Sequence, residues 1–244
     1  MTITSYLCEI SYINIGIFII IFIIILSLVI FAPKSKNFYN NDIFPIVDYL
    51  YKNNDDVFIK DLQLIKNDET KNNLWIKYPD KEYIINTYLI YPIYIYGLYS
   101  YKRYILSMNT SQLINTIPNI KGISYLKLNQ KSKIKKRKKW KEISNNTLCC
   151  LFVLESVYTS NPEECCIWVN GEIKPLVKNK LIIYDSSKEH SIINDTDSPV
   201  YLLELDIKKP KELAFGTSDR TFNDDIKKII KKIKKENKLF KKKI

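Results

Sequence analysis

The stretch that decides the fold is LIIYDSSKEHSIINDTDSPVYLLELDIKKP, residues 181–210. A first apolar strand ends at Asp185, a Ser-Ser-Lys turn follows, and a second strand begins at His190. A third apolar strand, VYLLELDI, comes near the end of the stretch. Branched and aromatic side chains favour strands, whereas clusters of Ser, Asp and Asn favour turns. The stretch therefore predicts short β-strands joined by turns.

The same pattern extends back to Gly122. The segment ISYLKLN alternates apolar and polar residues, LCCLFVLESVY is typical of a buried strand, and CCIWV and EIK flank Asn170-Gly171. An Asn-Gly pair between two apolar runs is a strong signal for a β-hairpin. Strands separated by turns about every ten residues predict a β-sandwich or a jelly roll.

Two short helices are expected before these strands, separated by the polar residues 53–56. Their apolar positions are Ile46, Leu50, Ile59, Leu62 and Ile65. Residues 82–106 are rich in Tyr and Ile, with expected breaks at Pro92 and Gly97. This composition predicts strands or a buried aromatic layer.

A basic helix and tail are expected over residues 211–244, with Asn223-Asp224-Asp225 as the helix cap. One face carries Ile226, Ile229, Ile230 and Ile233, and lysines surround it. Such a helix either packs on the domain or lies on a membrane. We expect its first half to pack and the final KLFKKKI to be free to bind anions.

The N-terminal part contains eighteen residues without a charge, IGIFIIIFIIILSLVIFA, ending at Ala32. At 1.5 Å per residue this length just spans a hydrocarbon core of about 30 Å. A cleaved signal peptide is disfavoured because no Lys or Arg precedes the apolar run. The sequence thus predicts a short segment 1–12, a transmembrane helix 13–32, a linker 33–39, and a single-pass membrane protein. The side that the domain faces stays open.

Charge and cysteine content limit the partners and the chemistry. The net charge of +12 favours anionic partners. Two adjacent cysteine pairs, Cys149-Cys150 and Cys165-Cys166, lack the spacing of a zinc site. Neighbouring residues of a strand point to opposite faces, so either one cross-strand disulfide or reduced buried thiols remain open.

Five segments from about Phe44 onward occur in a recognisable order. They are FPIVDYLYKNNDDVFIKDL, YPIYIYG, NTSQLINTIPNIKGISYLKLNQKSKI, CCIWVNGEI and the stretch 181–210, in which YDSS, His190, Asn194, Asp197 and Asp206 follow without gaps. This order resembles the aspartyl/asparaginyl β-hydroxylase family of Fe(II)/2-oxoglutarate dioxygenases. The resemblance implies a mainly β fold with flanking helices, a double-stranded β-helix (jelly roll), over residues 40–210.

The resemblance also implies an iron site, and most of its residues are replaced here. The first iron-binding His of the family's Ile-x-x-His-x-Gly motif corresponds to Arg137, and the Gly to Lys139. The family's Arg-x-His is replaced within residues 147–150, and its second 2-oxoglutarate-binding Arg corresponds to Val200. His190 is the only family metal ligand that remains. An arginine cannot replace the other, because a guanidinium has no lone pair to donate.

These replacements favour a membrane-anchored, catalytically inactive member of the family with a binding or structural role and no cofactor. The alternative is an active peptidyl Asp/Asn hydroxylase that uses Fe(II) and 2-oxoglutarate at a divergent iron site. A cationic loop is expected at the barrel mouth between Lys131 and Lys141, as either a solvated loop or an anion-binding surface. The anion-binding candidates are Lys133, Lys135, Lys136, Arg137, Lys138 and Lys139. Anionic lipid or an acidic protein would suit this surface, whereas nucleic acid is disfavoured because no RRM, KH or zinc-finger pattern occurs.

Overall fold

The computed structural model describes residues 17–24, 26–27, 35–69, 74–78, 81–95, 97–222 and 224–241. By its internal contacts the chain divides into two units, residues 1–34 with 211–214, and residues 35–210 with 215–244. The second unit, called the β domain below, contains every strand that the structure describes.

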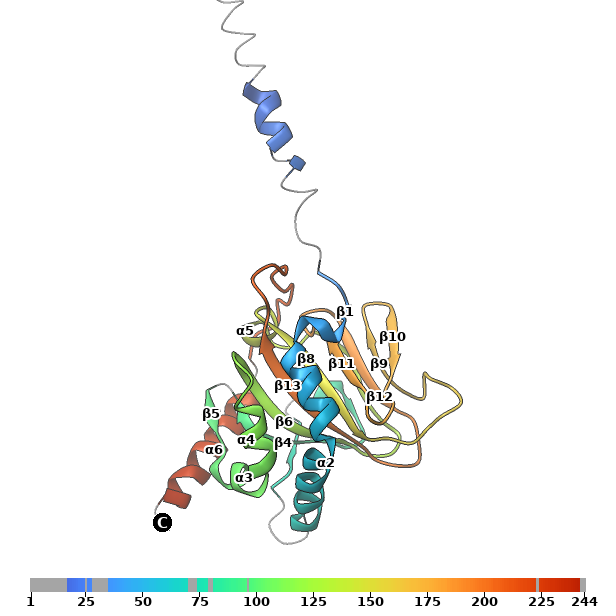
Figure 1. Ribbon diagram of the computed structural model, residues 1–244, viewed down its shortest axis with the longest axis vertical. Coiled ribbons are helices and arrows are strands. Elements are labelled where there is room, and N and C mark those ends of the chain that lie inside the picture. The colour runs from blue at the N-terminus through green and yellow to red at the C-terminus, as the bar shows by residue number, and fades with distance from the viewer. Residues whose placement is uncertain are drawn as a thin grey trace, which may run out of the picture. The chain divides into compact units, whose positions relative to one another are not determined.

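Two antiparallel sheets form the β domain (Figure 1). The eight-stranded first sheet has the order β1 (Phe38–Tyr39), β11 (Leu181–Tyr184), β8 (Thr147–Glu155), β13 (Val200–Lys208), β6 (Ile120–Leu128), β4 (Tyr88–Ile95) and β2 (Ile76–Lys77), and β5 (Leu98–Tyr99) pairs with β4. The five-stranded second sheet has the order β10 (Glu172–Pro175), β9 (Cys165–Val169), β12 (His190–Asn194), β7 (Ser132–Arg137) and β3 (Ile84–Ile85).

The connections make this pair of sheets a jelly roll. From β6 to β13 the chain alternates between the first and the second sheet, interrupted only by the β9–β10 hairpin. Apolar side chains from both sheets form one buried core cluster. In the hairpin, Asn170 and Gly171 have φ angles of 44° and 96°, the left-handed values that an Asn-Gly turn requires. The mainly β fold with flanking helices is therefore confirmed.

Strand β8 is buried on both of its faces. Cys149, Leu151 and Val153 point into the core between the two sheets. On the other face, the ring of Phe152 stacks on those of Tyr51 and Phe58, with centroids 4.7 and 5.7 Å apart. Both of these rings belong to helix α2, which therefore covers the outer face of the first sheet.

The helices are α2 (Pro45–Asp68), α3 (Tyr101–Leu106), α4 (Met108–Ile114), α5 (Lys141–Ser144) and α6 (Asp224–Lys241), with 3-10 turns η1 (Asn41–Ile43) and η2 (Lys81–Tyr83). Helix α2 is interrupted at Asn54, where φ is −140°, as its polar residues 53–56 predicted. The Tyr-rich segment 82–106 is only partly as expected, because its last residues form helix α3.

Two expected boundaries are wrong. Pro92 does not break the strand but lies inside β4, beside a register shift between Pro92 and Tyr94. A proline has no N–H to donate, so an irregular site is where a strand accommodates it. The expected linker ends too late, because Phe38 and Tyr39 form β1 and pair with Tyr184 and Ile183.

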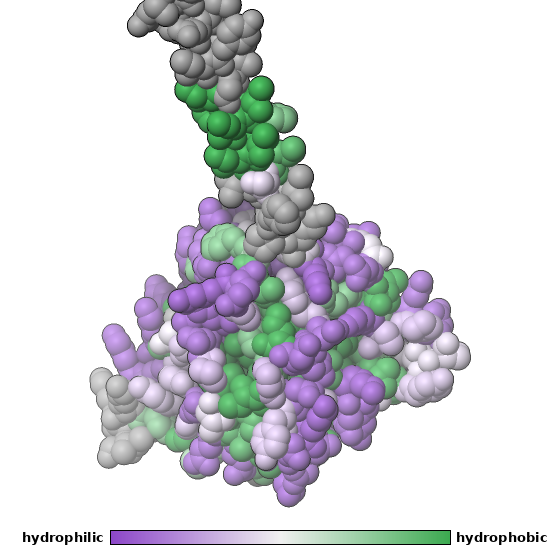
Figure 2. All heavy atoms as spheres, turned by 45° about the horizontal axis from the view of Figure 1, so that its top comes forward, coloured by the Kyte–Doolittle hydropathy of each residue, from purple (hydrophilic) through white to green (hydrophobic). Residues whose placement is uncertain are grey.

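Helix α6 packs on the β domain along more than its first half. Ile226, Ile229 and Ile233 are buried in the core cluster. Further along, Glu236 accepts a hydrogen bond of 2.8 Å from the buried guanidinium of Arg103. The lysines of this helix between residues 227 and 238 are exposed, and Figure 2 shows hydrophilic side chains interspersed with hydrophobic ones on the visible face of the β domain. The expected cap residue 223 and the tail residues 242–244 lie outside the described residues.

The prediction of a transmembrane helix over residues 13–32 is contradicted. Within this segment the structure describes residues 17–24 and 26–27 as helical, and the others lie outside the described residues. Among all described residues, no helix combines the length and the apolar character that crossing a membrane requires. The predicted single-pass membrane localisation is corrected accordingly.

The packing of α6 predicts a clear difference between two of its apolar residues. Ile233→Ala should lower the free energy of unfolding by about 2–4 kcal/mol, because Ile233 is fully buried and its loss leaves a cavity. Leu239→Ala, at a residue that is 54% exposed on the same helix, should change it by less than about 0.5 kcal/mol. Urea denaturation followed by circular dichroism measures both values, and equal effects would contradict the packing of α6.

Candidate functional site

The two positions that correspond to the family's iron-binding histidines lie opposite each other in the second sheet. Strands β7 and β12 pair so that Arg137 stands across from His190. Both side chains are buried, with 6% and 3% of their surfaces exposed. The jelly roll thus brings together the two residues that the sequence aligned with the iron site, but one of them is a cation.

Arg137 packs against aromatic rings inside the barrel. Its guanidinium carbon lies 4.6 Å from the ring centroid of Tyr78 and 6.0 Å from that of Trp140. The ring of Trp140 also lies 5.4 Å from the guanidinium of Arg220. A guanidinium over an aromatic face is attracted by the negative charge density of the ring. These contacts hold Arg137 in a place where a metal ligand was expected.

His190 is a neutral, buried imidazole. Its Nδ1–H donates to the carbonyl oxygen of Lys188 at 2.9 Å, and its ring meets that of Tyr184 edge-on. Burial, together with the positive charges of Arg137 and Lys139, lowers the pKa of His190 to about 3. With Nδ1 protonated, the lone pair of the neutral ring is on Nε2.

A second cation of the same segment reaches across to the first sheet. The Nζ of Lys139 lies 2.7 and 2.8 Å from the two carboxylate oxygens of Asp206, and 3.0 Å from Oε1 of Glu204. Both acids belong to β13. Burial lowers the pKa of Lys139, but the carboxylates of Asp206 and Glu204 outweigh this effect and hold it well above its ordinary value. Lys139 is therefore a charged ammonium inside the barrel.

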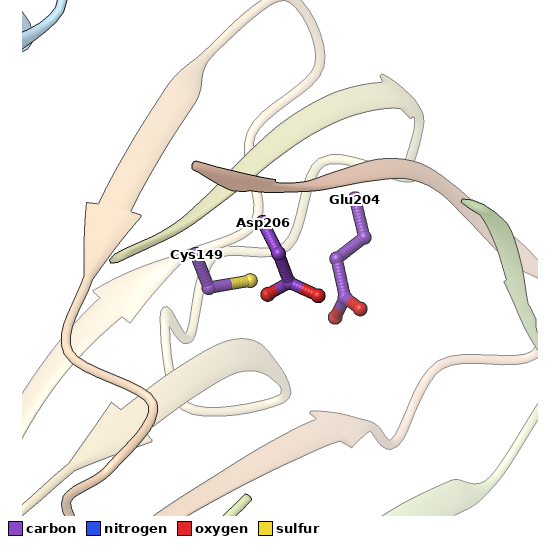
Figure 3. A group of neighbouring side chains, drawn as sticks. All are labelled: Cys149, Glu204 and Asp206. Carbon is purple, nitrogen blue, oxygen red and sulfur yellow. The ribbon is translucent and has the colours of Figure 1, made fainter. Parts of the chain in front are cut away.

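The thiol of Cys149 completes this cluster. One donor atom each from Cys149, Glu204 and Asp206 lies within 4.8 Å of the others, and Figure 3 shows the thiol and the two carboxylates turned toward a common space. Burial raises the pKa of Cys149 well above its ordinary value, so the thiol keeps its proton. The side chain of Tyr184 forms a hydrogen bond with Cys149 and links the cluster to His190.

The expected cationic loop is in fact strand β7 and the residues that follow it. A strand turns alternate side chains to opposite faces, so the basic residues are divided between outside and inside. Lys133, Lys135 and Lys136 are exposed, and Lys136 lies 3.9 Å from the ring centroid of Trp168. The half-buried Lys138 bonds to the exposed Asp219. Arg137 and Lys139 point inward, and Lys139 is already bound to carboxylates. The expected loop is therefore a strand and the residues after it, whereas anion binding by these six residues stays a prediction.

The positions that correspond to the family's two 2-oxoglutarate-binding arginines carry no positive charge that could bind a dicarboxylate. Val200, at the place of the second arginine, is completely buried at the start of β13. Thr147 and Cys150 are buried in β8. The cysteines of both pairs are free thiols, which answers the open question for these four residues.

Sequence reasoning missed the cluster around Lys139, although a signal was present. The strand VYLLELDI contains two acids, Glu204 and Asp206, at alternate positions. Alternate residues share one face of a strand, and Leu202 of the same face belongs to the core. Two carboxylates on a core-facing strand require a buried cation nearby. Lys139, which points inward from the basic run after β7, is that cation.

The neutral, buried state of His190 predicts a pH dependence of stability. Unfolding restores its ordinary pKa of about 6.5, so the unfolded chain takes up a proton that the folded chain does not. The free energy of unfolding should therefore fall as pH is lowered from 6.5 to 5, by up to about 1.4 kcal/mol per pH unit. His190→Gln should abolish this slope, since the chain has one histidine. Equal slopes for both proteins in urea denaturation would contradict a buried neutral imidazole.

Comparison with solved structures finds related folds at low similarity. A prolyl-4-hydroxylase from Pseudomonas putida is 9% identical with a TM-score of 0.41, over 64% of this chain and 88% of that one. A 2OG-Fe(II) oxygenase family oxidoreductase from Burkholderia pseudomallei is 10% identical with a TM-score of 0.39, over 65% and 82%. A predicted oxalate decarboxylase from Thermotoga maritima is 14% identical with a TM-score of 0.36, over 55% and 91%. Similarities of this size carry no argument about activity.

Comparison with curated proteins gave no match. A family model described as Aspartyl/Asparaginyl beta-hydroxylase, however, matches residues 60–210, which is more than half of the chain. The matched region runs from within helix α2 to the end of β13 and includes Arg137, His190, and the Lys139 cluster. The chain therefore belongs to the aspartyl/asparaginyl β-hydroxylase family.

Proposed function

We propose that this chain is a catalytically inactive member of the family that acts by binding a partner. The observation that carries the proposal is the pairing of β7 with β12, in which Arg137 stands opposite His190. A residue that cannot ligate a metal thus occupies the place of the family's first histidine. Because both side chains are buried inside the barrel, no other side chain of the chain can move into either place without rearranging the core.

Fe(II), on which the family depends, does not fit the residues around His190. The guanidinium of Arg137 has no lone pair to donate. The charges of Arg137, Lys139 and Arg220 that act on His190 would also act on a metal ion bound to it. Like charges repel strongly where little water screens them. His190 alone therefore supplies too few ligands for a metal ion, and the positive charges around it would repel that ion.

The second cosubstrate, 2-oxoglutarate, loses its expected charge partners. The family's two arginine positions fall on Val200 and within residues 147–150, and neither offers a guanidinium. Charge-assisted hydrogen bonds contribute on the order of 1.5–3 kcal/mol each. Loss of both would weaken the binding of a dicarboxylate by several orders of magnitude.

An active dioxygenase with a divergent site is the second candidate. Family membership favours it, and it requires new metal ligands beside His190. Among the described residues, one group of three potential ligands exists, Cys149, Glu204 and Asp206, and His190 is not part of it. The ammonium of Lys139 is already bound to both carboxylates of this group. The inactive form is therefore the better supported of the two.

The exposed side of β7 supports a binding role. Lys133, Lys135 and Lys136 are exposed, and Lys136 lies over the half-exposed ring of Trp168. A cationic surface with an aromatic side chain suits an acidic partner, since electrostatic attraction brings it in and the ring adds apolar contact. We propose an acidic protein segment as this partner.

Titration calorimetry of the full chain with Mn(II) and with 2-oxoglutarate tests the proposal. No binding of either is expected at micromolar concentration, for the reasons given above. Arg137→His, which restores an imidazole opposite His190, is the matched variant and should bind Mn(II) at least about ten-fold more tightly than the natural chain. Micromolar binding of both Mn(II) and 2-oxoglutarate by the natural chain would overturn the proposal.

A further inference from the structure

The interior of the barrel contains three potential metal donors, and a protein cation is bound to two of them. Carboxylates and a thiolate are donors that Zn(II) and Co(II) accept in proteins. Cys149, Glu204 and Asp206 place such donors within 4.8 Å of one another. They come from β8 and β13, neighbouring strands of the first sheet. Lys139 approaches them from the second sheet and contacts three carboxylate oxygens.

The backbone holds Lys139 firmly in this place. Its N–H donates to the carbonyl oxygen of Ser186 at 2.9 Å. Its own carbonyl oxygen accepts hydrogen bonds from the hydroxyls of Ser144 and Ser218, at 3.1 and 2.6 Å. The ammonium is thus delivered to the carboxylates by a fixed main chain. Lys139 thus differs from a flexible surface lysine, because it is buried and its main chain is fixed by hydrogen bonds.

The surroundings are shaped for the carboxylate of Asp206. Gly122, on the neighbouring strand β6, lies so close that a Cβ added there would stand 2.8 Å from Oδ2 of Asp206. Any larger residue would displace the acid. A small cavity of about 20 Å³ adjoins the cluster and is lined by Lys139, Glu204, Asp206 and Ile226. A space of this size holds about one water molecule, which is the fourth ligand that a three-donor site takes.

We infer that Lys139 is a built-in cation that fills, and thereby closes, a divalent-metal site formed by Cys149, Glu204 and Asp206. The ammonium supplies the positive charge that two buried carboxylates need, so the natural chain requires no metal there and admits none. The three donors of this site do not include His190, the expected iron ligand. It goes beyond the proposed function, which concerns that position and 2-oxoglutarate.

Charge accounts for both parts of this inference. With Lys139 in place, the two carboxylates and one ammonium leave a single negative charge in the cluster. Without it, two negative charges remain buried with no partner, which strongly destabilises a protein. A divalent cation restores the balance, and with the thiol deprotonated it binds three protein ligands. Removal of Lys139 should therefore turn a closed site into an open one.

Lys139→Ala in the full chain, titrated with Co(II), tests the inference. The variant should bind Co(II) at least about a hundred-fold more tightly than the natural chain, because the competing ammonium is gone. It should also show thiolate-to-cobalt charge-transfer absorption, and its melting temperature should rise with added metal. Lys138→Ala, the same charge change at the neighbouring residue bound to the exposed Asp219, should do none of these. Lys139→Ala/Cys149→Ser should lose the absorption.

Each other result counts against the inference. Thiolate-to-cobalt absorption in the natural chain, removed by Cys149→Ser, would mean that Lys139 does not close the site. No gain in Lys139→Ala would mean that the three donors do not form a metal site. If Lys139→Ala does not fold without metal, refolding is compared in Co(II), Zn(II) and Mg(II), and recovery must occur with the first two alone. The two proposals can fail separately. The proposed function fails if the natural chain binds 2-oxoglutarate and a metal at His190, whereas this inference concerns only metal binding at Cys149, Glu204 and Asp206.

Discussion

The ion cluster of Lys139, Glu204 and Asp206 is the interaction on which the interior of the β domain depends. The two acids lie on β13, at the centre of the first sheet, and Lys139 follows β7 of the second. Their contacts therefore join the two sheets through charge, in addition to the apolar side chains around them. A buried charge is tolerated only with a partner at hydrogen-bonding distance, so a change of Lys139 alone leaves both acids without their cation.

Arg137 and Lys139 follow from a single feature of the chain, the run of basic residues that ends β7. Strand geometry turns part of this run to the solvent and part to the core. The buried charges of the two inward-facing residues, Arg137 and Lys139, are stabilised in different ways. Arg137 lies over the rings of Tyr78 and Trp140, whereas Lys139 is neutralised by acids. The barrel thus holds two buried side-chain cations near His190, each stabilised in a different way.

The fold and the position of His190 at the start of a strand could be predicted from the sequence. The contacts of the candidate site could be predicted only in part. Period-two apolar strands, the Asn170-Gly171 turn and the polar break near Asn54 have local causes, and all appear as predicted. The pairing of Arg137 with His190 required the family's motifs, because no local pattern brings these residues together. The binding of Lys139 to Asp206 depends on contact between two sheets and could not be obtained from spacing. The predicted single-pass membrane localisation was wrong, because no described helix is long and apolar enough to cross a membrane.

Strand β8 carries two adjacent thiols that lie in different surroundings. Cys149 points into the barrel toward Tyr184 and the acids of β13, while Cys150 lies on the opposite face of β8, the face that helix α2 covers at Phe152. A thiol reagent would reach the first only if the barrel opened and the second only if α2 lifted from the sheet. The pair is therefore a natural set of two chemical probes, one residue apart, that report separately on the two layers of the molecule.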